Sequence, residues 1–324
     1  MLAITIDPQT QALRWSEAPT PELAPGTLRI RVCATAVNRA DLVQRAGRYN
    51  PPPGASQILG LECAGVVEAV SEAGRYQPGD RVCALLSGGG YAEQVVVPVG
   101  QVLPIPDGMS FTEAAALPEV LTTAWLNLYR EGALQPGEHV VLHAGASGVG
   151  TAALQLLRRS GNPAFVTAGS AEKIARCVAL GAAGGANRHE GSFREAVLGW
   201  TGGRGADVIL DPVGAGYLDE NLKSLAIRGR LVLIGLLSGR RAELDMGRVL
   251  VRRLRVIGSV LRARSVAEKA DIIAGLEADA WPAVARGEIT PTIDRVMPIQ
   301  AAEEAHAVIA SNQTVGKVVL SVGA

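Results

Sequence analysis

The chain has 324 residues, which is enough for two domains that each bury a core. Its 31 basic residues balance its 31 acidic residues, so the charge gives no reason to expect a nucleic acid or an anionic membrane surface as a partner. Hydrophobic residues make up 48% of the chain and 38 residues are glycine, a composition that suits an α/β protein rich in tight turns.

No segment indicates membrane insertion or secretion. No apolar run reaches the ~20 residues that a membrane-spanning helix needs. Residues 1–10 lack the basic and apolar regions of a secretory signal. We therefore expect a cytoplasmic protein.

Residues 1–118 have the features of a β-rich domain. Leu28–Val32 alternates apolar and polar side chains, and Glu93–Val97 is another strand-forming run. Clusters of glycine and proline, which favour turns, separate such runs at residues 51–54, 78–80 and 88–90. The pattern predicts short strands joined by tight turns.

From residue 119 helices and strands alternate. Leu121–Tyr129 has a helical pattern, and five short runs typical of strands follow it: Val140–His143, Phe165–Ala168, Val208–Leu210, Leu231–Ile234 and Arg255–Gly258. Strands separated by helical stretches predict right-handed crossovers and a doubly wound parallel sheet over residues 119–261. Residues 262–324 contain helical patterns at 267–276 and 301–310 and a last strand, Lys317–Leu320. The pattern leaves open whether this tail rejoins the first domain.

A glycine-rich turn follows the first strand of the doubly wound part. Gly148, Gly150 and Ala153 fit G-x-G-x-x-A, and a helix is expected from about Thr151. Glycines allow a tight turn and a close approach to a pyrophosphate, which the helix N-terminus stabilises. The alternative is a structural turn without a ligand. The residues expected to contact a dinucleotide here are Ala146, Ser147, Gly148, Val149 and Gly150.

The second strand, Ala164–Ala168, bears on which dinucleotide binds. NAD-specific sites place an acid near the tip of this strand, and no acid stands there. Instead, Ser170 can donate a hydrogen bond to a 2′-phosphate, and Lys173 and Arg188 can neutralise it. Both cations could equally be solvated surface residues. The sequence favours NADP(H) over NAD(H).

The cysteines and histidines do not indicate a metal site. The four cysteines have no C-x-x-C spacing and no nearby histidine, so we expect buried, reduced thiols; they are Cys33, Cys63, Cys83 and Cys177. His143 and His306 are interpreted as packed or half-exposed residues. No P-loop, H-E-x-x-H or G-x-S-x-G motif is present.

Six separated segments, in order, resemble the zinc-independent quinone oxidoreductase (zeta-crystallin-like) group of the medium-chain dehydrogenase/reductase superfamily. They are AVNRADLVQRAGRYNPPPGASQILGLECAGVV, GDRVCALLSGGGYAEQVVVP, HAGASGVGTAALQL, VTAGSAEKIARCVALGA, IDRVMPIQAAEEAH and GKVVL. The string RYNPPPGASQILGLE is especially similar to the branch that contains a DNA-damage-induced NADPH:quinone oxidoreductase. The resemblance covers nearly the whole chain.

The resemblance implies a GroES-like catalytic domain, built from residues 1–118 and 262–324, around a Rossmann domain at 119–261, with the active site in the cleft. Zinc-dependent relatives carry a cysteine ligand before the position of Asp41 and a histidine before that of Glu62. Neither ligand stands in this chain. The resemblance therefore implies catalysis without a metal, and we interpret Glu62 as structural.

Cofactor contacts are also implied by the resemblance. Thr123 resembles the threonine beside the nicotinamide, Ser147 and Gly148 resemble the pyrophosphate turn, and Gly169, Ser170 and Lys173 match the 2′-phosphate loop. Arg188 stands where relatives commonly have an aromatic residue, so its role is open. The later contacts implied are Gly235, Leu236, Val260, Leu261 and Asn312.

The implied activity is reduction of a quinone by NADPH. Tyr49 is the candidate donor of a hydrogen bond to a quinone oxygen, and Asn38 the second polar group, aiding orientation. Tyr49 could instead only pack on the substrate or cofactor. The group also contains enoyl reductases, and its relatives include lens crystallins and RNA-associated proteins, which leaves two alternatives: an NADPH-dependent enone or enoyl reductase, and a binding protein.

The resemblance implies at least a homodimer. Arg255–Val260 is an apolar strand that could extend the sheet across a two-fold axis. The alternative is an ordinary internal strand.

Overall fold

A computed structural model describes residues 1–323. Its contacts divide the chain into two compact units: unit 1 comprises residues 1–122 and the segment from Leu261 onward, and unit 2 comprises Thr123–Val260. The boundaries expected from the sequence, 118/119 and 261/262, lie four residues and one residue away from these. No helix of the described residues is both long and apolar enough to cross a bilayer.

Unit 1 is built on a seven-stranded sheet whose order is β14-β15-β3-β4-β5-β7, with β6 also paired to β3. Its strands, with a separate β1–β2 hairpin, are β1 (Leu2–Ile6), β2 (Leu13–Glu17), β3 (Thr27–Val37), β4 (Glu62–Val70), β5 (Arg81–Leu85), β6 (Gln94–Pro98), β7 (Val102–Pro104), β14 (Ile293–Pro298) and β15 (Lys317–Ser321). Its helices are α1 (Arg39–Arg45), α2 (Phe111–Ala114), α9 (Val266–Asp279), α10 (Trp281–Ala285) and α11 (Ala302–Ala310).

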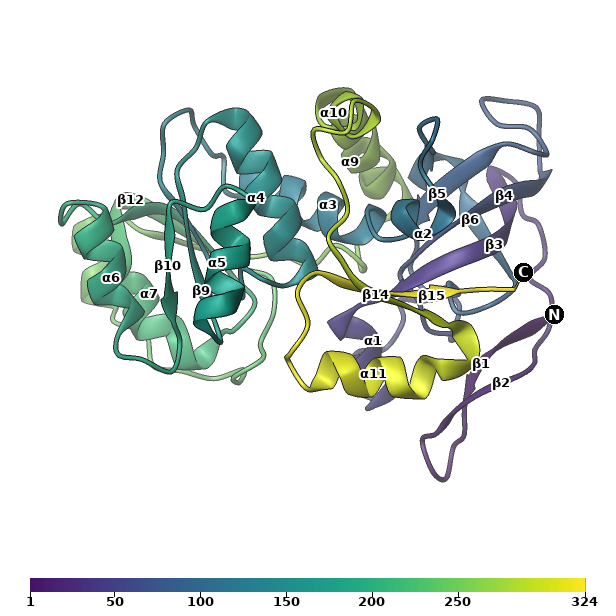
Figure 1. Cartoon of the computed structure of the whole chain (residues 1–324), viewed down its shortest axis with the longest axis horizontal. Coiled ribbons are helices and arrows are strands. Elements are labelled where there is room, and N and C mark those ends of the chain that lie inside the picture. The colour runs from purple at the N-terminus through teal and green to yellow at the C-terminus, as the bar shows by residue number, and fades with distance from the viewer. Residues whose placement is uncertain (324) are drawn as a thin grey trace. The chain divides into compact units, whose positions relative to one another are not determined.

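Both ends of the chain contribute to this sheet. Leu28, Ile30 and Val32 alternate along β3 and are buried in its core, as the polarity pattern predicts. β15 pairs antiparallel with β3, Val318 opposite Val37, and Figure 1 shows the C-terminal strands beside the N-terminal ones. The tail therefore rejoins the first domain, a point that the sequence pattern left open.

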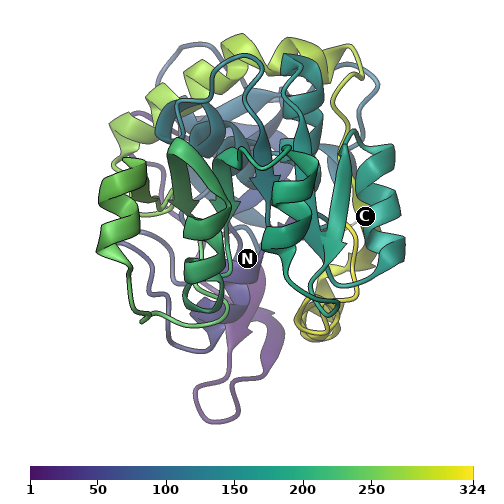
Figure 2. The same ribbon diagram turned by 90° about the vertical axis from the view of Figure 1, so that its left-hand side faces the viewer.

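Unit 2 is a parallel six-stranded sheet of order β10-β9-β8-β11-β12-β13, which is the strand order of a Rossmann domain. Its strands are β8 (Val140–Leu142), β9 (Ala164–Ala168), β10 (Gly184–Asn187), β11 (Ala206–Asp211), β12 (Leu225–Leu233) and β13 (Arg255–Gly258). Its helices are α4 (Gly148–Ser160), α5 (Ala171–Ala179), α6 (Phe193–Trp200), α7 (Leu218–Ser224) and α8 (Met246–Arg252). Helices cover both faces of the sheet (Figures 1 and 2).

Two helices differ in detail from their predictions. α4 begins at Gly148 rather than near Thr151, because Ser147 caps it and its glycines form the first turn. The helix expected at Leu121–Tyr129 is α3 (Pro118–Trp125), which continues as a π-helical turn, Leu126–Glu131.

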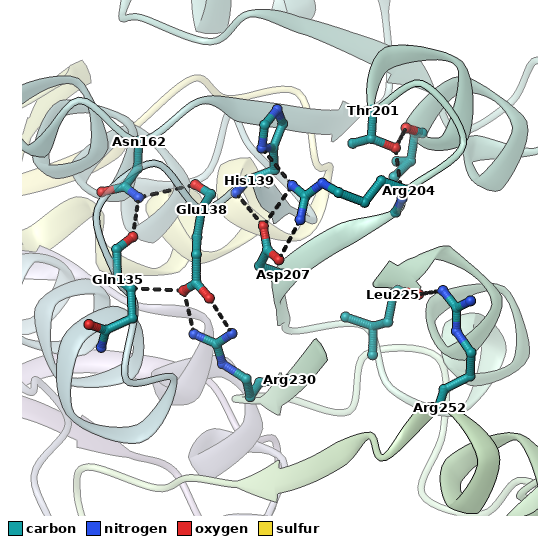
Figure 3. Close-up of polar contacts among 12 residues, drawn as sticks. Gln135, Glu138, His139, Asn162, Thr201, Arg204, Asp207, Leu225, Arg230 and Arg252 are labelled. Carbon is teal, nitrogen blue, oxygen red and sulfur yellow. Dashed lines mark hydrogen bonds and ion pairs between the residues drawn. The ribbon is translucent and has the colours of Figure 1, made fainter. Parts of the chain in front are cut away.

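The amino ends of the unit 2 strands are held by ion pairs. The Arg230 guanidinium binds the Glu138 carboxylate through two hydrogen bonds of 2.8 and 2.5 Å. Arg204 binds Asp207 in the same way at 2.7 and 2.8 Å, and Asp207 also accepts the His139 backbone N–H (Figure 3). These contacts hold β8, β11 and β12 together at their amino ends. The carboxyl ends of the strands are left for a ligand.

β13 lies at the edge of the sheet and pairs with β12. The alternative that this strand is internal is therefore wrong. Several large apolar side chains of the same part of unit 2 are exposed, among them Leu250 at 77% and Val251 at 76%.

Candidate nucleotide and active sites

The glycine-rich turn of unit 2 is shaped by backbone contacts that exclude side chains. The Gly145 N–H donates to the Thr167 carbonyl at 2.9 Å. A Cβ on Gly145 would lie 2.5 Å from the Val166 side chain, and one on Gly150 would collide with the Gly145 backbone. Both positions therefore require glycine.

The turn presents free donors at the start of α4. Ser147 Oγ accepts the Gly150 N–H at 3.1 Å and caps this 13-residue helix. The N–H groups of Gly148 and Val149 precede any intrahelical acceptor, and both residues are half-buried. Such groups, with the positive end of the helix dipole, suit a pyrophosphate.

Gly169 and Ser170, two of the residues predicted for a 2′-phosphate, form the loop after β9, and Lys173 lies in the first turn of the helix that follows. Ser170 caps α5, and its Oγ accepts the Lys173 N–H at 3.3 Å, so its own hydrogen remains able to donate. The Arg188 guanidinium lies against Gly169, about 3.4 Å from where a Cβ on Gly169 would stand. The Arg188 side chain thus reaches this loop from the position directly after β10.

Behind the turn lies a buried chain of hydrogen bonds. Asn221 Nδ2 donates to Asp211 at 2.9 Å, so Asn221 Oδ1 accepts from His143 Nε2 at 2.6 Å, and His143 Nδ1 accepts from Thr167 at 2.9 Å. Burial lowers the pKa of His143 to about 4, and burial raises that of Asp211 to about 6. A neutral, packed His143 agrees with the sequence interpretation, and the chain ties β9, β8 and β11 together beside the turn.

The remaining predicted cofactor residues are placed as follows. The Thr123 carbonyl accepts from Asn127 Nδ2 at 2.7 Å, which holds the turn where the π-helix begins. Gly235 packs so closely on Pro212 that a Cβ would lie 2.8 Å from its carbonyl oxygen. Leu236 and Val260 are about half exposed, Leu261 is buried, and Asn312 lies in an exposed loop of unit 1, where it accepts from Arg39.

In unit 1, Asn38 belongs to a buried ionic network. Lys317 Nζ donates to Glu62 Oε1 at 2.7 Å, to Asn38 Oδ1 at 2.7 Å and to the Val37 carbonyl at 3.0 Å. Asn38 Nδ2 donates to Glu62 at 2.9 Å and to the Ala36 carbonyl at 3.3 Å. Both amide hydrogens of Asn38 are therefore engaged within the protein.

A second network fixes the start of α1. Asp41 accepts the backbone N–H groups of Asn38 at 2.7 Å and Gly60 at 3.1 Å. The Tyr91 hydroxyl lies 3.3 Å from Asp41 and 3.2 Å from His306 Nε2. Burial raises the pKa of Asp41 to about 6 and lowers that of His306 to about 4. These two networks join β3, β4, α1, α11 and β15.

Arg262 holds the loop that carries Tyr49. Its guanidinium lies 5.1 Å from the centre of the Tyr49 ring and donates to the carbonyls of Tyr49 (3.3 Å) and Ser87 (2.9 Å) and to Gln44 Oε1 (2.7 Å). The Tyr49 hydroxyl has no hydrogen-bond partner within residues 1–323. Burial, then the charge of Glu119, raises the pKa of Tyr49 to about 12.

The described residues contain no group of three or more histidine, cysteine or acidic side chains arranged for a metal. All four cysteines are unpaired. At the positions where the resemblance implies ligands in zinc-dependent relatives, this chain has Ala40 and Leu61, and the Glu62 carboxylate is bound by the Lys317 ammonium. The donor set at this position does not fit zinc.

Comparisons with known proteins agree with this architecture. The family model for the alcohol dehydrogenase GroES-like domain matches residues 24–107, and that for zinc-binding dehydrogenase matches residues 148–275. The human synaptic vesicle membrane protein VAT-1 homolog is 32% identical over 321 residues, which cover 94% of this chain and 81% of that protein. The chain belongs to the medium-chain dehydrogenase/reductase superfamily.

Other proteins match as well. Lovastatin diketide synthase lovF of Aspergillus terreus is 35% identical over 278 residues, or 82% of this chain, but this chain spans only 11% of the length of that synthase. The quinone oxidoreductase of Thermus thermophilus, solved with NADPH, has a TM-score of 0.84 and 32% identity over 99% of this chain and 100% of its own. CurK enoyl reductase has a TM-score of 0.84 and 28% identity over 99% and 98%.

Sequence reasoning missed three charged residues of the unit 1 contacts described above, Lys317, Arg262 and Glu119. Lys317 lies within the GKVVL segment, but nothing local shows that its ammonium reaches Glu62. Arg262 and Glu119 stand near the domain boundaries, and their partners lie far away in the sequence: Arg262 contacts Gln44 across 218 positions. A lysine or arginine within an apolar stretch of sequence is the available signal that a cation is buried, but it does not identify the residue that the cation binds.

Proposed function

We propose that the protein is an NADPH-dependent quinone oxidoreductase that transfers hydride without a metal. The observation that carries this proposal is a free tyrosine hydroxyl, that of Tyr49, held by a buried arginine in the catalytic unit. The similarity to the Thermus thermophilus quinone oxidoreductase, solved with NADPH, supports it.

The residues present fit a phosphorylated dinucleotide. We assign the pyrophosphate to the amides at the start of α4, and the 2′-phosphate to Ser170, Lys173 and Arg188. When bound, the reduced nicotinamide supplies a hydride equivalent. The protein binds and orients it, and we propose that Thr123, Gly235, Leu236, Val260, Leu261 and Asn312 line the remainder of its site.

Tyr49 suits a neutral acceptor oxygen. A phenol with a pKa near 12 stays protonated at neutral pH, so it donates a hydrogen bond rather than carrying a charge. Reduction places negative charge on the quinone oxygens, and a hydrogen bond that strengthens as this charge develops lowers the barrier. Because the Asn38 amide hydrogens are engaged, we propose that Asn38 positions the loop and Glu62.

Replacing Tyr49 with phenylalanine tests the donor role. We expect Tyr49→Phe to lower kcat/KM with 1,2-naphthoquinone by about tenfold or more, since one charge-assisted hydrogen bond to a developing oxyanion is worth about 2 kcal/mol. NADPH affinity serves as the control and should not change. Full activity of the variant would leave Tyr49 only a packing role.

The second candidate is an NADPH-dependent enone or enoyl reductase. The similarity to CurK enoyl reductase and to a segment of a polyketide synthase favours it. The same hydroxyl would then face the carbonyl oxygen that activates the C=C bond. NADPH oxidation measured with a 2-enoyl thioester against 1,2-naphthoquinone, and with NADH against NADPH, separates the two activities and tests the cofactor preference.

A protein that chiefly binds, as a crystallin or an RNA-associated protein does, is the third interpretation. The balanced charge gives nucleic acid no electrostatic basis. Salt-sensitive RNA binding at sub-micromolar concentration, with slow NADPH turnover on every electrophile, would favour it over the enzyme.

We further propose a homodimer formed across β13. This edge strand has one partner, which leaves its outer backbone groups unpaired, and Val256 and Val260 on or after it are exposed. Two such strands related by a two-fold axis would continue the sheet. Light scattering should give twice the chain mass, and a monomer mass would rule the proposal out.

A further inference from the structure

Glu119 is an acidic group that the proposed hydride transfer does not use. It stands in the first turn of α3, and its backbone N–H donates to Glu62 Oε2 at 2.9 Å. The side chain is half-buried, and its carboxyl oxygens accept no hydrogen bond within residues 1–323. These oxygens keep access to solvent, so the carboxyl is available to a molecule bound beside it.

Charged groups from several elements of unit 1 surround this carboxyl. Those that interact with it electrostatically are Glu62 of β4, Asp41 of α1, Lys317 of β15, Lys269 of α9, and Arg262 and Tyr49. Arg262 and Lys269 are each only 3% exposed, and neither forms an ion pair with a carboxylate in the described part of the chain. Lys269 Nζ instead donates to Ser87 Oγ at 2.5 Å.

The surroundings of Glu119 favour its protonated form at neutral pH. Burial, followed by the like charge of Glu62, raises its pKa to about 8, although Lys317 and Lys269 oppose the shift. Tyr49 has a pKa of about 12, so Glu119 is the stronger acid of the two. A hydroxyl that weakly acidic can donate a hydrogen bond but is a poor net source of a proton.

We propose that Glu119 supplies the proton that the acceptor takes up when it is reduced, an inference that rests on the proposed function. The acceptor gains two electrons and one hydrogen as hydride from the reduced nicotinamide. The Glu119 O–H bond then breaks, and its proton goes to the anionic oxygen of the reduced acceptor. Water returns a proton to the carboxylate. The Tyr49 hydroxyl orients that oxygen.

The other acids and the lysine of the networks do not suit this task. Asp41 and Glu62 are fully buried, and each carboxylate accepts hydrogen bonds at both oxygens. Lys317 uses its three donors on Glu62, Asn38 and the Val37 carbonyl. Glu119 combines a free carboxyl with electrostatic contact to Tyr49.

The test compares Glu119→Gln, which keeps shape but carries no acidic proton, with Glu119→Asp, which keeps the acid. We expect wild-type kcat/KM for NADPH and 1,2-naphthoquinone to fall about tenfold per pH unit above pH ~8. Glu119→Gln should be about a hundred-fold less active at neutral pH and independent of pH across this range. Glu119→Asp should regain the pH-dependent fall.

Two measurements keep the outcome decisive. The matched control Glu304→Gln, an exposed acid on α11, should retain the wild-type profile, and NADPH affinity shows that each variant is folded. Infrared difference spectra should show a carboxylic acid band that titrates near pH 8 and is missing in Glu119→Gln. A wild-type pH profile in Glu119→Gln, or no such band, overturns the inference. If the wild type reduces neither quinones nor enoyl thioesters, the proposed function fails instead, and the band still decides whether Glu119 holds a proton.

Discussion

Unit 2 and unit 1 build their polar centres in different ways. Most of the candidate phosphate-binding groups of unit 2 come from two short stretches, residues 146–150 and 169–173, and the caps that shape them are local: the Ser147 Oγ accepts the Gly150 N–H across three positions. The centre of unit 1 joins the two ends of the chain, since Lys317 reaches Asn38 across 279 positions. The first is shaped by backbone and glycine, the second by buried charge. The two units should therefore fail for different reasons when single residues are changed.

The largest effect is expected for Lys317→Met. The substitution leaves the Glu62 carboxylate, which is 0% exposed, buried without its cation. Breaking a buried pair on one side costs about 3–5 kcal/mol, because the remaining charge is uncompensated. Chemical denaturation should show this loss, and hydrogen exchange should place it in the peptides of β3 and β15.

Arg230→Met is the matched variant in unit 2. The Glu138–Arg230 pair (Figure 3) is partly open to solvent, with Glu138 at 22% exposure, so its loss should cost less than that of Lys317. Equal losses of stability in Lys317→Met and Arg230→Met would show that the burial of charge does not distinguish the two units.

The second prediction concerns pH and His143. The pKa of His143 is about 4 in the folded protein, against an ordinary value of 6.5 for a histidine exposed to water, so the unfolded chain takes up the proton first. Stability contributed by neutral His143 is present above pH 6.5 and is lost as pH falls towards 4, by about 3 kcal/mol. His143→Gln should abolish this loss.

Asp211 acts in the opposite direction on the same network. Its pKa is raised to about 6, so the cost of burying its charge is relieved as pH falls below that value. The difference in stability between the wild type and His143→Gln, followed against pH, isolates the contribution of the histidine, because Asp211 is present in both proteins. Hydrogen exchange of β8 and β9 peptides at pH 7 and pH 4 is the measurement. A constant difference between the two pH values would contradict the assignment.

The same contrast explains how far sequence reasoning reached. The strand Ala164–Ala168 was predicted to within one residue, and the glycine turn was found, because alternation, apolar runs and turn glycines are local properties. The Lys317–Glu62 pair could not be predicted, since no spacing rule links residues 255 positions apart. Its discovery needs the antiparallel pairing of β15 with β3, which tertiary packing decides.

The third prediction addresses the backbone of unit 2. Gly150→Ala puts a Cβ into the Gly145 backbone, so the turn must open. We expect a loss of about 1–3 kcal/mol in stability and a tenfold or larger loss of NADPH affinity. Gly199→Ala, in α6, meets no atom within 4 Å and should instead stabilise slightly, as alanine does in helices. If both variants bound NADPH like the wild type, the turn would not be a nucleotide site.

The smallest effect is expected for Arg188→Gln, which tests a side chain of unit 2 that reaches its loop from the turn after β10. Its guanidinium lies against Gly169, beside Ser170, so its loss removes one charged contact to a 2′-phosphate and none to a 2′-hydroxyl. We expect the Kd for NADPH to rise about tenfold, or about 1.4 kcal/mol, with little change for NADH. The exposed Arg194 on α6 provides the control, and Arg194→Gln should change neither affinity. An equal loss of affinity for NADPH and NADH would mean that Arg188 supports the loop itself. Unit 2 would then depend on a side chain distant in the sequence, as unit 1 does.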